Sequence, residues 1–416
     1  MINLILSFSF LLIISRNYGA SVLGLFTISQ SFLYIFSIFS RLGLDVASIR
    51  LIPEYNQNSD FNQIKNFYFF SFILIIIVSL LMSYFLFVNA SRISTYFFDK
   101  LDLINYLKII ALTLPAFSIL TWHSEIFRGF KNLILYLFFR QTFISLFSII
   151  IIICAILSLK STYYSIISFS ISVYLSLFLS FVFIINHIKL RKIKKIDFNF
   201  NFIKVLKISV PMMLTSSIML FMNWTDTIIL GYYKTEYDVG IYSVVMKISM
   251  LCTINLFAIN SIVAPKFSEL YFSKNKKEFK KIILKSSKLI FISTLPILLF
   301  IVILHEKILL LFGEEFNNGK LALFILLIGQ GINSISGSVG FILQMTGKQN
   351  TFQKIVILSL VSNIFLNIIL IPKFGLVGAA TSSVVSYIIW NLLSVYKIYK
   401  FYNILTIYYP YKISNL

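Results

Sequence analysis

Charged residues are scarce in this chain. They occupy 12% of its 416 positions, while hydrophobic residues occupy 58%. Soluble domains usually carry about 25% charged residues, which keep their surfaces polar. The composition therefore excludes a water-soluble globular protein of this length and indicates a surface that is largely solvated by lipid.

Cysteines and the signatures of common catalytic sites are scarce as well. The two cysteines, Cys154 and Cys252, lie in separate apolar runs, so the sequence indicates no disulfide framework. It contains no GxxxxGK[ST] phosphate loop, no HExxH pair and no Cys/His metal cluster. We therefore expect no enzyme, no ATP-driven transport by this chain alone, no cofactor and no metal site. A coupling ion, sodium or a proton, stays open.

The hydrophobic residues that are present form long continuous runs, such as FYFFSFILIIIVSLLMSYFLFV at 67–88. A chain that crosses hydrocarbon must satisfy its own backbone hydrogen bonds, so only helices or closed barrels can span it. Barrel strands alternate over about 10 residues, whereas these runs match the roughly 20 residues of a membrane helix. The predicted fold is an all-α polytopic membrane protein with about twelve transmembrane helices. The runs lie near 1–14, 21–40, 66–88, 104–121, 133–157, 163–186, 208–230, 239–262, 289–311, 320–343, 353–371 and 376–396.

The distribution of basic residues predicts the orientation. Of the 36 Lys and Arg residues, 25 lie after even-numbered runs or in the C-terminal tail, 9 lie in odd-numbered connections, and 2 lie within spans. Because basic loops stay on the cytoplasmic side, we expect a bacterial inner membrane protein with both termini in the cytoplasm. The net charge of +21 then requires no nucleic acid, since such loops lie over anionic lipid. Binding of a partner enzyme is the alternative.

An internal repeat indicates two six-helix lobes. RNYGASVLGLF aligns with YYKTEYDVGIY and pairs Gly24 with Gly240, at an offset of 216. FRGFKN aligns with MTGKQN and pairs Gly129 with Gly347, at an offset of 218. Because six spans separate the copies, both copies lie on the same membrane side, and the lobes are predicted to be parallel repeats.

The repeat also predicts the lobe boundaries. We expect an N-terminal lobe at 1–190, a basic cytoplasmic linker at 191–207 and a C-terminal lobe at 208–416. Helix seven begins near Lys207, and subtracting 216 puts the equivalent start of helix one before Met1. We therefore expect either that helix one is short by about ten residues at its cytoplasmic end or that the true start of the protein lies upstream. The fourteen residues of helix one cover only about 21 Å of a hydrocarbon core of about 30 Å.

Six segments are similar to those of a known family. They are SRNYGASVLGLF at 15–26, RLGLDVASIRLIPEY at 41–55, NWTDTIILGYYKTEYDVGIYSVVMKIS at 223–249, LLLFGEEFNNGKLALFILLIGQGIN at 309–333, LQMTGKQN at 343–350 and NIFLNIILIPKFGLVGAATSSVVSYIIWN at 363–391. In this order and spacing they resemble the polysaccharide-transporter family of Wzx-type O-antigen flippases, within the multidrug/oligosaccharidyl-lipid/polysaccharide exporter superfamily. The resemblance covers essentially the whole chain. This chain departs from the family pattern in two ways. Its first helix is short, and it has twelve spans where some relatives have fourteen.

The resemblance implies a fold and an activity. The fold is a V-shaped pair of six-helix bundles around a central cavity. The activity is translocation of polyprenyl-pyrophosphate-linked oligosaccharide across the cytoplasmic membrane, for assembly of lipopolysaccharide O-antigen or capsule. The expected partners are the lipid-linked oligosaccharide and membrane lipids, with a polysaccharide polymerase and a chain-length protein as further candidates.

Two other functions stay open. One is a multidrug or cation antiporter of the same superfamily, which should carry acidic groups in its cavity. The few charges within these spans are mostly positive. The other is a membrane polysaccharide polymerase, which should need a large extracytoplasmic loop. The longest odd-numbered connection here has about fifteen residues.

Ionisable residues within spans are the candidate substrate-binding residues, because a charge in hydrocarbon is costly. Arg140 in helix five is expected to contact phosphate bidentately, or otherwise to tie helices together. Lys247 in helix eight is expected to contact phosphate or sugar, unless it pairs with Asp226. Asp226 lies in helix seven, with Asn223 three residues earlier on the same face. It is expected to bind a coupling cation, a proton or sugar hydroxyls, or to cap a helix end.

Other polar residues are expected to have mainly structural roles. Arg41 and Asp45, at the cytoplasmic end of helix two, are secondary site candidates whose spacing of four favours an ion pair. His123 and Glu125 are expected to anchor helix four at the interface. Hydrogen bonds between helices are expected of the polar residues within spans, namely Gln330, Asn333, Gln344, Asn363 and Asn367.

The predicted orientation can be tested with reporter fusions. Alkaline phosphatase fused within 187–207 or 265–288 should be inactive and green fluorescent protein fluorescent, because these basic segments are expected to stay in the cytoplasm. Fusions near Lys100 and Lys234 are the controls and should report the opposite side. An active phosphatase in either basic segment would reverse the assigned orientation.

Overall fold

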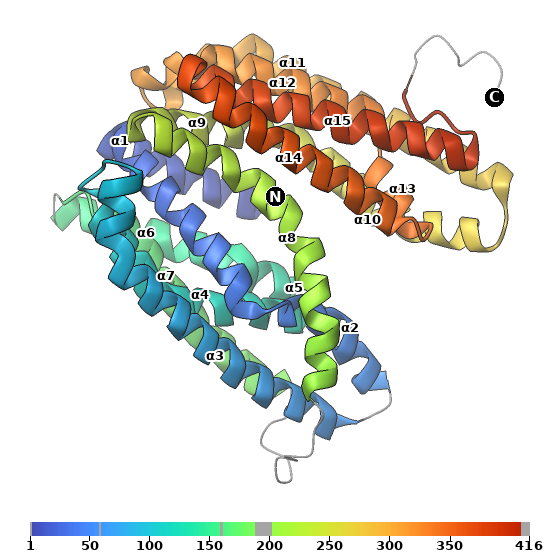
Figure 1. Cartoon of the computed structure of the whole chain (residues 1–416), viewed down its shortest axis with the longest axis horizontal. Coiled ribbons are helices and arrows are strands. Elements are labelled where there is room, and N and C mark those ends of the chain that lie inside the picture. Colours follow the sequence, from blue (N-terminus) through green and yellow to red (C-terminus); the bar gives the residue numbers. More distant parts are fainter. Residues whose placement is uncertain (1, 58–59, 159–160, 188–201, 409–416) are drawn as a thin grey trace. The chain divides into compact units, whose positions relative to one another are not determined.

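The computed structural model describes residues 2–57, 60–158, 161–187 and 202–408, although some side chains in these ranges, including those of 214–216, 219, 220 and 223, lie outside the description. The described chain is built from helices and connecting turns (Figure 1). It divides into two compact units, 1–224 and 225–416. The predicted linker at 191–207 lies largely outside the described residues. The two units divide further along the chain, between Trp224 and Thr225, inside α8.

The first unit contains long helices and two π-helical turns. In chain order they are α1 (Ile2–Arg41), α2 (Leu44–Gln57), α3 (Phe61–Arg92), η1 (Ile93–Phe97), α4 (Leu103–Gly129), α5 (Leu133–Leu137), η2 (Phe138–Thr142), α6 (Phe143–Ser158), α7 (Tyr164–His187) and the first part of α8 (Phe202–Tyr233). Helix α4 packs against α1, α2, α3 and α7. It is the central helix of this unit.

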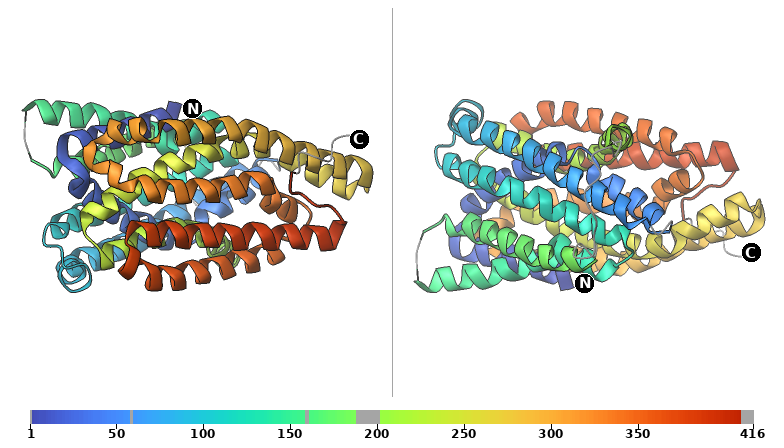
Figure 2. Two further views of the ribbon diagram at one scale, coloured as in Figure 1. Left: turned by 90° about the horizontal axis from the view of Figure 1, so that it is seen from above. Right: turned by 90° about the horizontal axis from the view of Figure 1, so that it is seen from below.

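The second unit contains the end of α8 and the remaining helices. They are α9 (Glu236–Ser249), η4 (Met250–Thr253), α10 (Ile254–Phe272), α11 (Lys276–Phe312), η5 (Glu314–Gly319), α12 (Lys320–Ser336), α13 (Val339–Met345), α14 (Gln349–Phe374) and α15 (Leu376–Tyr402). Helices α10 and α11 form a long antiparallel hairpin, drawn in yellow and orange in Figure 2. Helix α15 packs against both α12 and α14.

The described helices account for the twelve predicted spans. Ten helical segments are long and apolar enough to cross a membrane. One of them, Asn3–Arg41, holds the first two predicted runs, which are separated at Gly19 (φ 80°, ψ 177°). The seventh run lies in α8 and is additional to the ten. The prediction of an all-α multi-pass membrane protein is confirmed.

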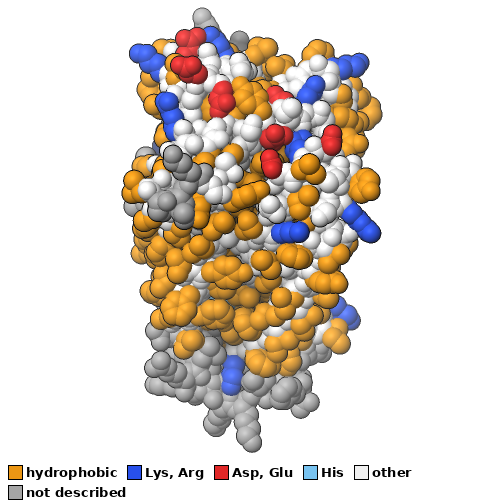
Figure 3. Space-filling view, turned by 90° about the vertical axis from the view of Figure 1, so that its left-hand side faces the viewer, with side chains coloured by type: hydrophobic (Ala, Val, Ile, Leu, Met, Phe, Trp, Pro, Cys, Tyr) orange, Lys and Arg blue, Asp and Glu red, His pale blue; other side chains and the backbone are white. Residues whose placement is uncertain are grey.

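Large hydrophobic side chains are exposed on the surface of several helices, as expected for helices in contact with lipid. Leu81, Phe178 and Ile303 are 63%, 69% and 74% exposed along α3, α7 and α11. Figure 3 shows one face of the molecule, on which hydrophobic side chains predominate and the few acidic side chains lie in the upper part of the view. Exposure of this kind is unfavourable in water and normal in hydrocarbon.

Small polar side chains cap the N-termini of several helices. Asp60, Asn132 and Asn275 each accept a hydrogen bond from a backbone N–H three residues later, at 3.1–3.2 Å, and so cap α3, α5 and α11. Thr235 and Asp238 form a reciprocal capping box at the start of α9. These bonds satisfy N–H groups that have no partner within a helix.

The backbone of two turns corrects the alignment of the repeat. In the turn after α4 the residue with left-handed φ is Lys131 (62°), and after α13 it is Gly347 (76°). In each turn the next backbone N–H donates to the carbonyl five residues earlier, at 2.9 and 2.8 Å, as in a Schellman motif. Gly347 therefore corresponds to Lys131 and not to Gly129. The offset, 347 − 131 = 216, equals that of Gly24 and Gly240.

A glycine sets the contact between α8 and the break that separates α1 from α2. Leu42 and Gly43 have φ of 48° and 75° at this break. A Cβ atom on Gly43 would collide with the Ser209 carbonyl of α8 and lie 2.9 Å from the Met213 Cβ. Only glycine allows this close approach of two backbones without strain.

Gly43→Ala should therefore destabilise the fold more than Gly347→Ala. Both positions require positive φ, which costs about 1–2 kcal/mol with a side chain. Gly347 has no neighbouring atom within 4 Å of the added Cβ, so it reports backbone strain alone. We expect Gly43→Ala to lower the thermal unfolding temperature in detergent several degrees further. Equal shifts for the two variants would contradict the steric role of Gly43.

Candidate functional sites

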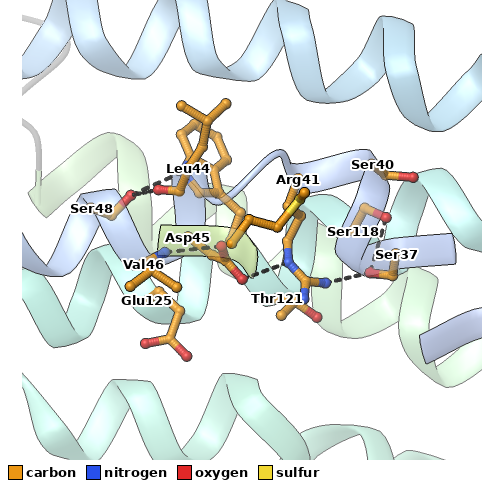
Figure 4. A network of polar contacts seen from close by, with 12 residues as sticks. Ser37, Ser40, Arg41, Leu44, Asp45, Val46, Ser48, Ser118, Thr121 and Glu125 are labelled. Atoms are coloured by element: carbon orange, nitrogen blue, oxygen red, sulfur yellow. Dashed lines mark hydrogen bonds and ion pairs between the residues drawn. The ribbon is translucent and has the colours of Figure 1, made fainter. Parts of the chain in front are cut away.

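A buried arginine joins three helices in the first unit. The Arg41 Nε donates to Asp45 Oδ2 at 2.8 Å, and its Nη1 donates to Ser37 Oγ. Ser118 of α4 in turn donates to Ser37 at 3.1 Å. Figure 4 shows this chain of contacts across the break between α1 and α2. Arg41 is only 5% exposed, and its charge is balanced within the protein.

The ion pair between Arg41 and Asp45 is the one that their spacing predicted. Arg41 is the last residue of α1, and Asp45 lies in the first turn of α2. The chain turns at Leu42 and Gly43 and continues as α2 to Gln57. Arg41 thus lies beside the Ser118 region of α4, well before α4 ends at Gly129. The sequence pattern did not reveal this turn, which puts Arg41 and Asp45 in two successive helices.

Arg140 lies in η2, a π-helical turn within an otherwise α-helical span. Turns of this kind frequently occur at functional sites. The Arg140 Nη1 lies 3.5 Å from Oε1 of Glu125 on α4, which exceeds the roughly 2.7–2.9 Å of a strong charge-assisted hydrogen bond. Nη1 makes no hydrogen bond to any described residue, while the side chain is 31% exposed. Arg140 therefore keeps capacity for another anion.

Glu125 contacts a second arginine. Its Oε2 lies 3.5 Å from Nη1 of Arg128, one helical turn along α4. The Arg128 guanidinium also lies 5.3 Å from the ring centre of Tyr136. Glu125 is 7% exposed and His123 is fully buried, where the sequence analysis expected interfacial anchors. The polar run TWHSE within an apolar helix was the available signal for a buried network.

His123 belongs to a separate buried contact set. Its Nδ1 lies 2.8 Å from Ser180 Oγ, and its Nε2 lies 3.1 Å from the hydroxyl of Tyr68. The ring also packs edge-on against Phe181. Both ring nitrogens therefore have partners on α3 and α7, and the residue ties these helices to α4.

A fully buried carboxylate, Asp226, organises polar contacts in the second unit. Its Oδ1 accepts hydrogen bonds from the Asn363 and Asn367 side chains at 3.0 and 2.6 Å. Its Oδ2 accepts from the hydroxyl of Tyr242 at 2.8 Å and from that of Ser383. Four donors thus join α8, α9, α14 and α15 around one charge. This set is much larger than the helix cap considered from the sequence.

The partners of Asp226 were only partly foreseeable. Asn363 and Asn367 were expected to hydrogen-bond between helices, and their spacing of four puts both on one face of α14. That this face meets Asp226 could not be inferred, because the contact spans 137 and 141 residues. Ser383 and Tyr242 lie among many similar hydroxyls, with no local signal. The side chain of Asn223 lies outside the described residues.

Lys247 makes no hydrogen bond or ion pair with the described residues, and its side chain is half-buried within α9. The alternative of a structural pair with Asp226 is therefore absent from the described contacts. A cation in a span without a partner is costly. This arrangement is typical of a residue that meets a ligand or water.

The described surroundings of Asp226 contain too few carboxylate, histidine or cysteine side chains for a metal cluster. The described residues contain no group of three or more His, Cys, Asp or Glu that could hold a metal ion. Asp226 provides one carboxylate, and the Oδ1 of Asn367 beside it is buried without a hydrogen-bond partner in the described structure. The groups that contact the Asp226 carboxylate in the described structure are hydrogen-bond donors.

Comparison with known proteins assigns the family. The family model described as "Polysaccharide biosynthesis protein" matches residues 1–271, which is more than half of the chain. The chain belongs to this family. A second model, MatE, matches residues 211–369 and so extends the similarity of this family member through the second unit.

Curated relatives match parts of the chain. A probable low-salt glycan biosynthesis flippase, Agl15 of Haloferax volcanii, is 25% identical over 44% of the chain and 39% of its own length. The capsular polysaccharide biosynthesis protein CapF of Staphylococcus aureus is 28% identical over 50% of the chain and 53% of its own length. The matched region thus spans about half or less of these two relatives.

Solved structures share the fold over nearly the whole chain. An inward-facing multidrug resistance MATE family transporter has a TM-score of 0.76 and 16% identity, with 96% of this chain and 95% of that chain covered. The lipid II flippase MurJ, in an inward closed conformation, has a TM-score of 0.73 and 18% identity, with 95% and 85% covered. At these identities the similarity concerns the fold.

Substitutions at Asp226 should separate hydrogen bonding from charge. Asp226→Asn should cost about 1–3 kcal/mol, because the new NH2 group cannot accept the bonds that the replaced oxygen accepted and leaves buried donors unpaired. Asp226→Lys should cost more, since it buries a cation among donors. Thermal unfolding of the purified protein measures both effects.

Ser382→Ala is the control, because the Ser382 hydroxyl bonds only to the Gly378 carbonyl of its own helix in the described contacts. A shift no larger than in this control would show that Asp226 does not organise the unit.

Proposed function

We propose that this protein is a flippase for lipid-linked oligosaccharides. Its substrate would be a polyprenyl-pyrophosphate-linked oligosaccharide, moved across the cytoplasmic membrane for assembly of O-antigen or capsule. The observation that carries the proposal is that each unit holds a membrane-embedded cation that the protein leaves incompletely neutralised. These cations are Arg140, with one long contact to Glu125, and Lys247, without an ion pair among the described residues.

The chemistry of the substrate matches these cations. A pyrophosphate carries concentrated negative charge that cannot enter hydrocarbon without a partner, because moving an ion into a low dielectric is costly. The planar guanidinium of Arg140 can bind two phosphate oxygens at once, whereas the ammonium of Lys247 provides a point charge. The lipid tail needs no protein partner and can remain in the bilayer.

Family membership and named relatives support the same substrate class. Agl15 is described as a glycan biosynthesis flippase, CapF as a capsular polysaccharide biosynthesis protein, and MurJ as a lipid II flippase. On this proposal, the chain transports and does not catalyse. It would lie in the inner membrane with both termini in the cytoplasm, and a polymerase and chain-length protein would act on its product.

Asp226 is our candidate for coupling transport to an ion gradient. A sodium ion would use the carboxylate and the neighbouring amide and hydroxyl oxygens, after rotation of the Asn363 and Asn367 amide groups. A proton would instead neutralise the carboxylate directly. Either event changes the charge at the point where four helices meet, and so can bias the packing of that unit.

A multidrug antiporter is the second candidate, and the similarity to a MATE transporter favours it. Such a protein should bind lipophilic cations through acidic groups. In the described spans Asp226 is enclosed by four donors and Glu125 by two arginines, so neither carboxylate is free for an organic cation. Ethidium resistance in an efflux-deficient strain would favour the antiporter.

Complementation of a flippase-deficient strain tests the proposal. Arg140→Ala and Lys247→Ala should each reduce surface glycan at least tenfold at equal membrane levels, because the pyrophosphate loses a cation. Arg140→Lys should remain impaired if bidentate contact matters, whereas Lys247→Arg should be tolerated. Glycan immunoblots, with membrane blots for protein level, measure the outcome.

Lys281→Ala is the matched control, because Lys281 is exposed and pairs with Glu278 on the same helix at 3.4 Å. It should support normal glycan export. Normal export by both Arg140→Ala and Lys247→Ala would contradict the proposed roles of the two cations.

A further inference from the structure

We propose that Arg128 and Arg140 form an anion site for the phosphate groups of a lipid, and that Glu125 is the counter-ion this anion displaces. The inference rests on the proposed function and adds Arg128 and Glu125 to it. It concerns residues of the first unit only.

The geometry of the three residues is that of a shared carboxylate. Each oxygen of Glu125 faces one guanidinium, Oε1 toward Arg140 and Oε2 toward Arg128, both at 3.5 Å. Glu125 is 10% exposed in its side chain, while Arg128 and Arg140 are 46% and 31% exposed. The carboxylate therefore lies inside, and both arginine side chains remain partly accessible, while the Arg140 Nη1 itself is buried without a hydrogen-bond partner among the described residues.

The charge balance of the surrounding network favours an additional anion. Glu125 also lies within electrostatic range of Arg41 and Asp45. Arg41 donates hydrogen bonds to Asp45 and Ser37, and in Figure 4 no dashed line joins it to Glu125. With the three arginines charged and both carboxylates ionised, the group carries 3 − 2 = +1. An unmatched positive charge in a membrane protein is unfavourable until an anion binds.

The lengths of the two ion pairs allow exchange. At 3.5 Å, neither contact has the short geometry of a strong charge-assisted hydrogen bond, about 2.7–2.9 Å. One carboxylate divided between two guanidinium groups leaves most of their N–H donors unused. A phosphate group has more oxygens and more charge than a carboxylate, so it can satisfy both arginines at once. When no phosphate is bound, Glu125 keeps both arginines paired.

The backbone around the pair is shaped for this arrangement. Arg128 lies in the last turn of α4, next to Gly129, where a Cβ atom would lie 2.8 Å from the Ser48 carbonyl of α2. The short helix α5 then leads into the π-helical turn that carries Arg140. From this turn the Arg140 side chain reaches Glu125 on α4 at 3.5 Å.

Titration with inorganic pyrophosphate tests the site directly. The full-length protein, in nanodiscs of phosphatidylcholine, is titrated by microscale thermophoresis. Glu125→Gln should tighten pyrophosphate binding about tenfold, because removal of the competing charge leaves the arginines free. Arg128→Gln should weaken it about tenfold by the same reasoning. Glu125→Asp, which is too short to reach both arginines, should tighten it to a smaller extent.

Glu278→Gln is the control, because Glu278 pairs with Lys281 at 3.4 Å on an exposed face of the other unit. It should leave the affinity unchanged. Unchanged or weaker binding in both Glu125→Gln and Glu125→Asp, with normal elution as a folded protein, would overturn the inference and leave Glu125 as a tie between α4 and η2.

Two further arms separate the possible sources of the phosphate. Nanodiscs that contain phosphatidylglycerol should weaken pyrophosphate binding in the wild type only if phospholipid headgroups occupy the site. Unchanged binding there assigns the site to pyrophosphate-bearing lipids. The flippase proposal is judged separately by complementation. Suppose that the wild type exports glycan and that the Glu125 variants bind pyrophosphate with the affinity of the wild type. This result would refute the role of Glu125 as a displaced counter-ion and would leave the flippase proposal intact.

Discussion

The cost of an unpaired charge in hydrocarbon is the constraint on which this structure depends. Each ionisable residue within the spans must be neutralised by the protein, reach water or bind a ligand. Arg41 and Asp226 are neutralised by the protein, since Arg41 contacts Asp45 and Ser37 and Asp226 accepts hydrogen bonds from buried side chains. Arg140 and Lys247 are not, since one has a single long contact and the other has none among the described residues. This contrast separates structural charges from candidate ligand-binding charges.

The two units meet this constraint differently. In the second unit four neutral donors surround one carboxylate, Asp226, so the stabilisation comes from hydrogen bonds. In the first unit arginines and carboxylates alternate around Glu125, so it comes from opposite charges. Loss or gain of a small cation would act on the carboxylate site in the second unit. Binding of an anion would act on the arginine site in the first unit. On our proposal, the anionic lipid would bind in the first unit and the coupling cation at Asp226.

The sequence predicted the spans because hydrophobic length is a local property of the chain. It also predicted the Arg41–Asp45 pair, which local spacing determines. It could not predict that Asn367 meets Asp226 across 141 residues, because that contact depends on how four helices pack. The alignment of Gly129 with Gly347 failed for a related reason. A turn requires a residue with positive φ, and in one copy of the repeat Lys131 occupies that position, so matching glycines misplaced the register.

A transport protein also needs its binding cations to be stable when no substrate is present. Two arginines close together in a span would repel each other and disfavour the folded state. Full neutralisation by two strong ion pairs would solve this problem, but it would leave no affinity for phosphate. A single buried carboxylate at 3.5 Å from each arginine gives an intermediate solution. It compensates one charge, leaves the network positive, and forms contacts that a more highly charged anion can replace. The same logic explains why Glu125 belongs on α4, the central helix of the unit, where it is held while the arginines on its flanks remain accessible.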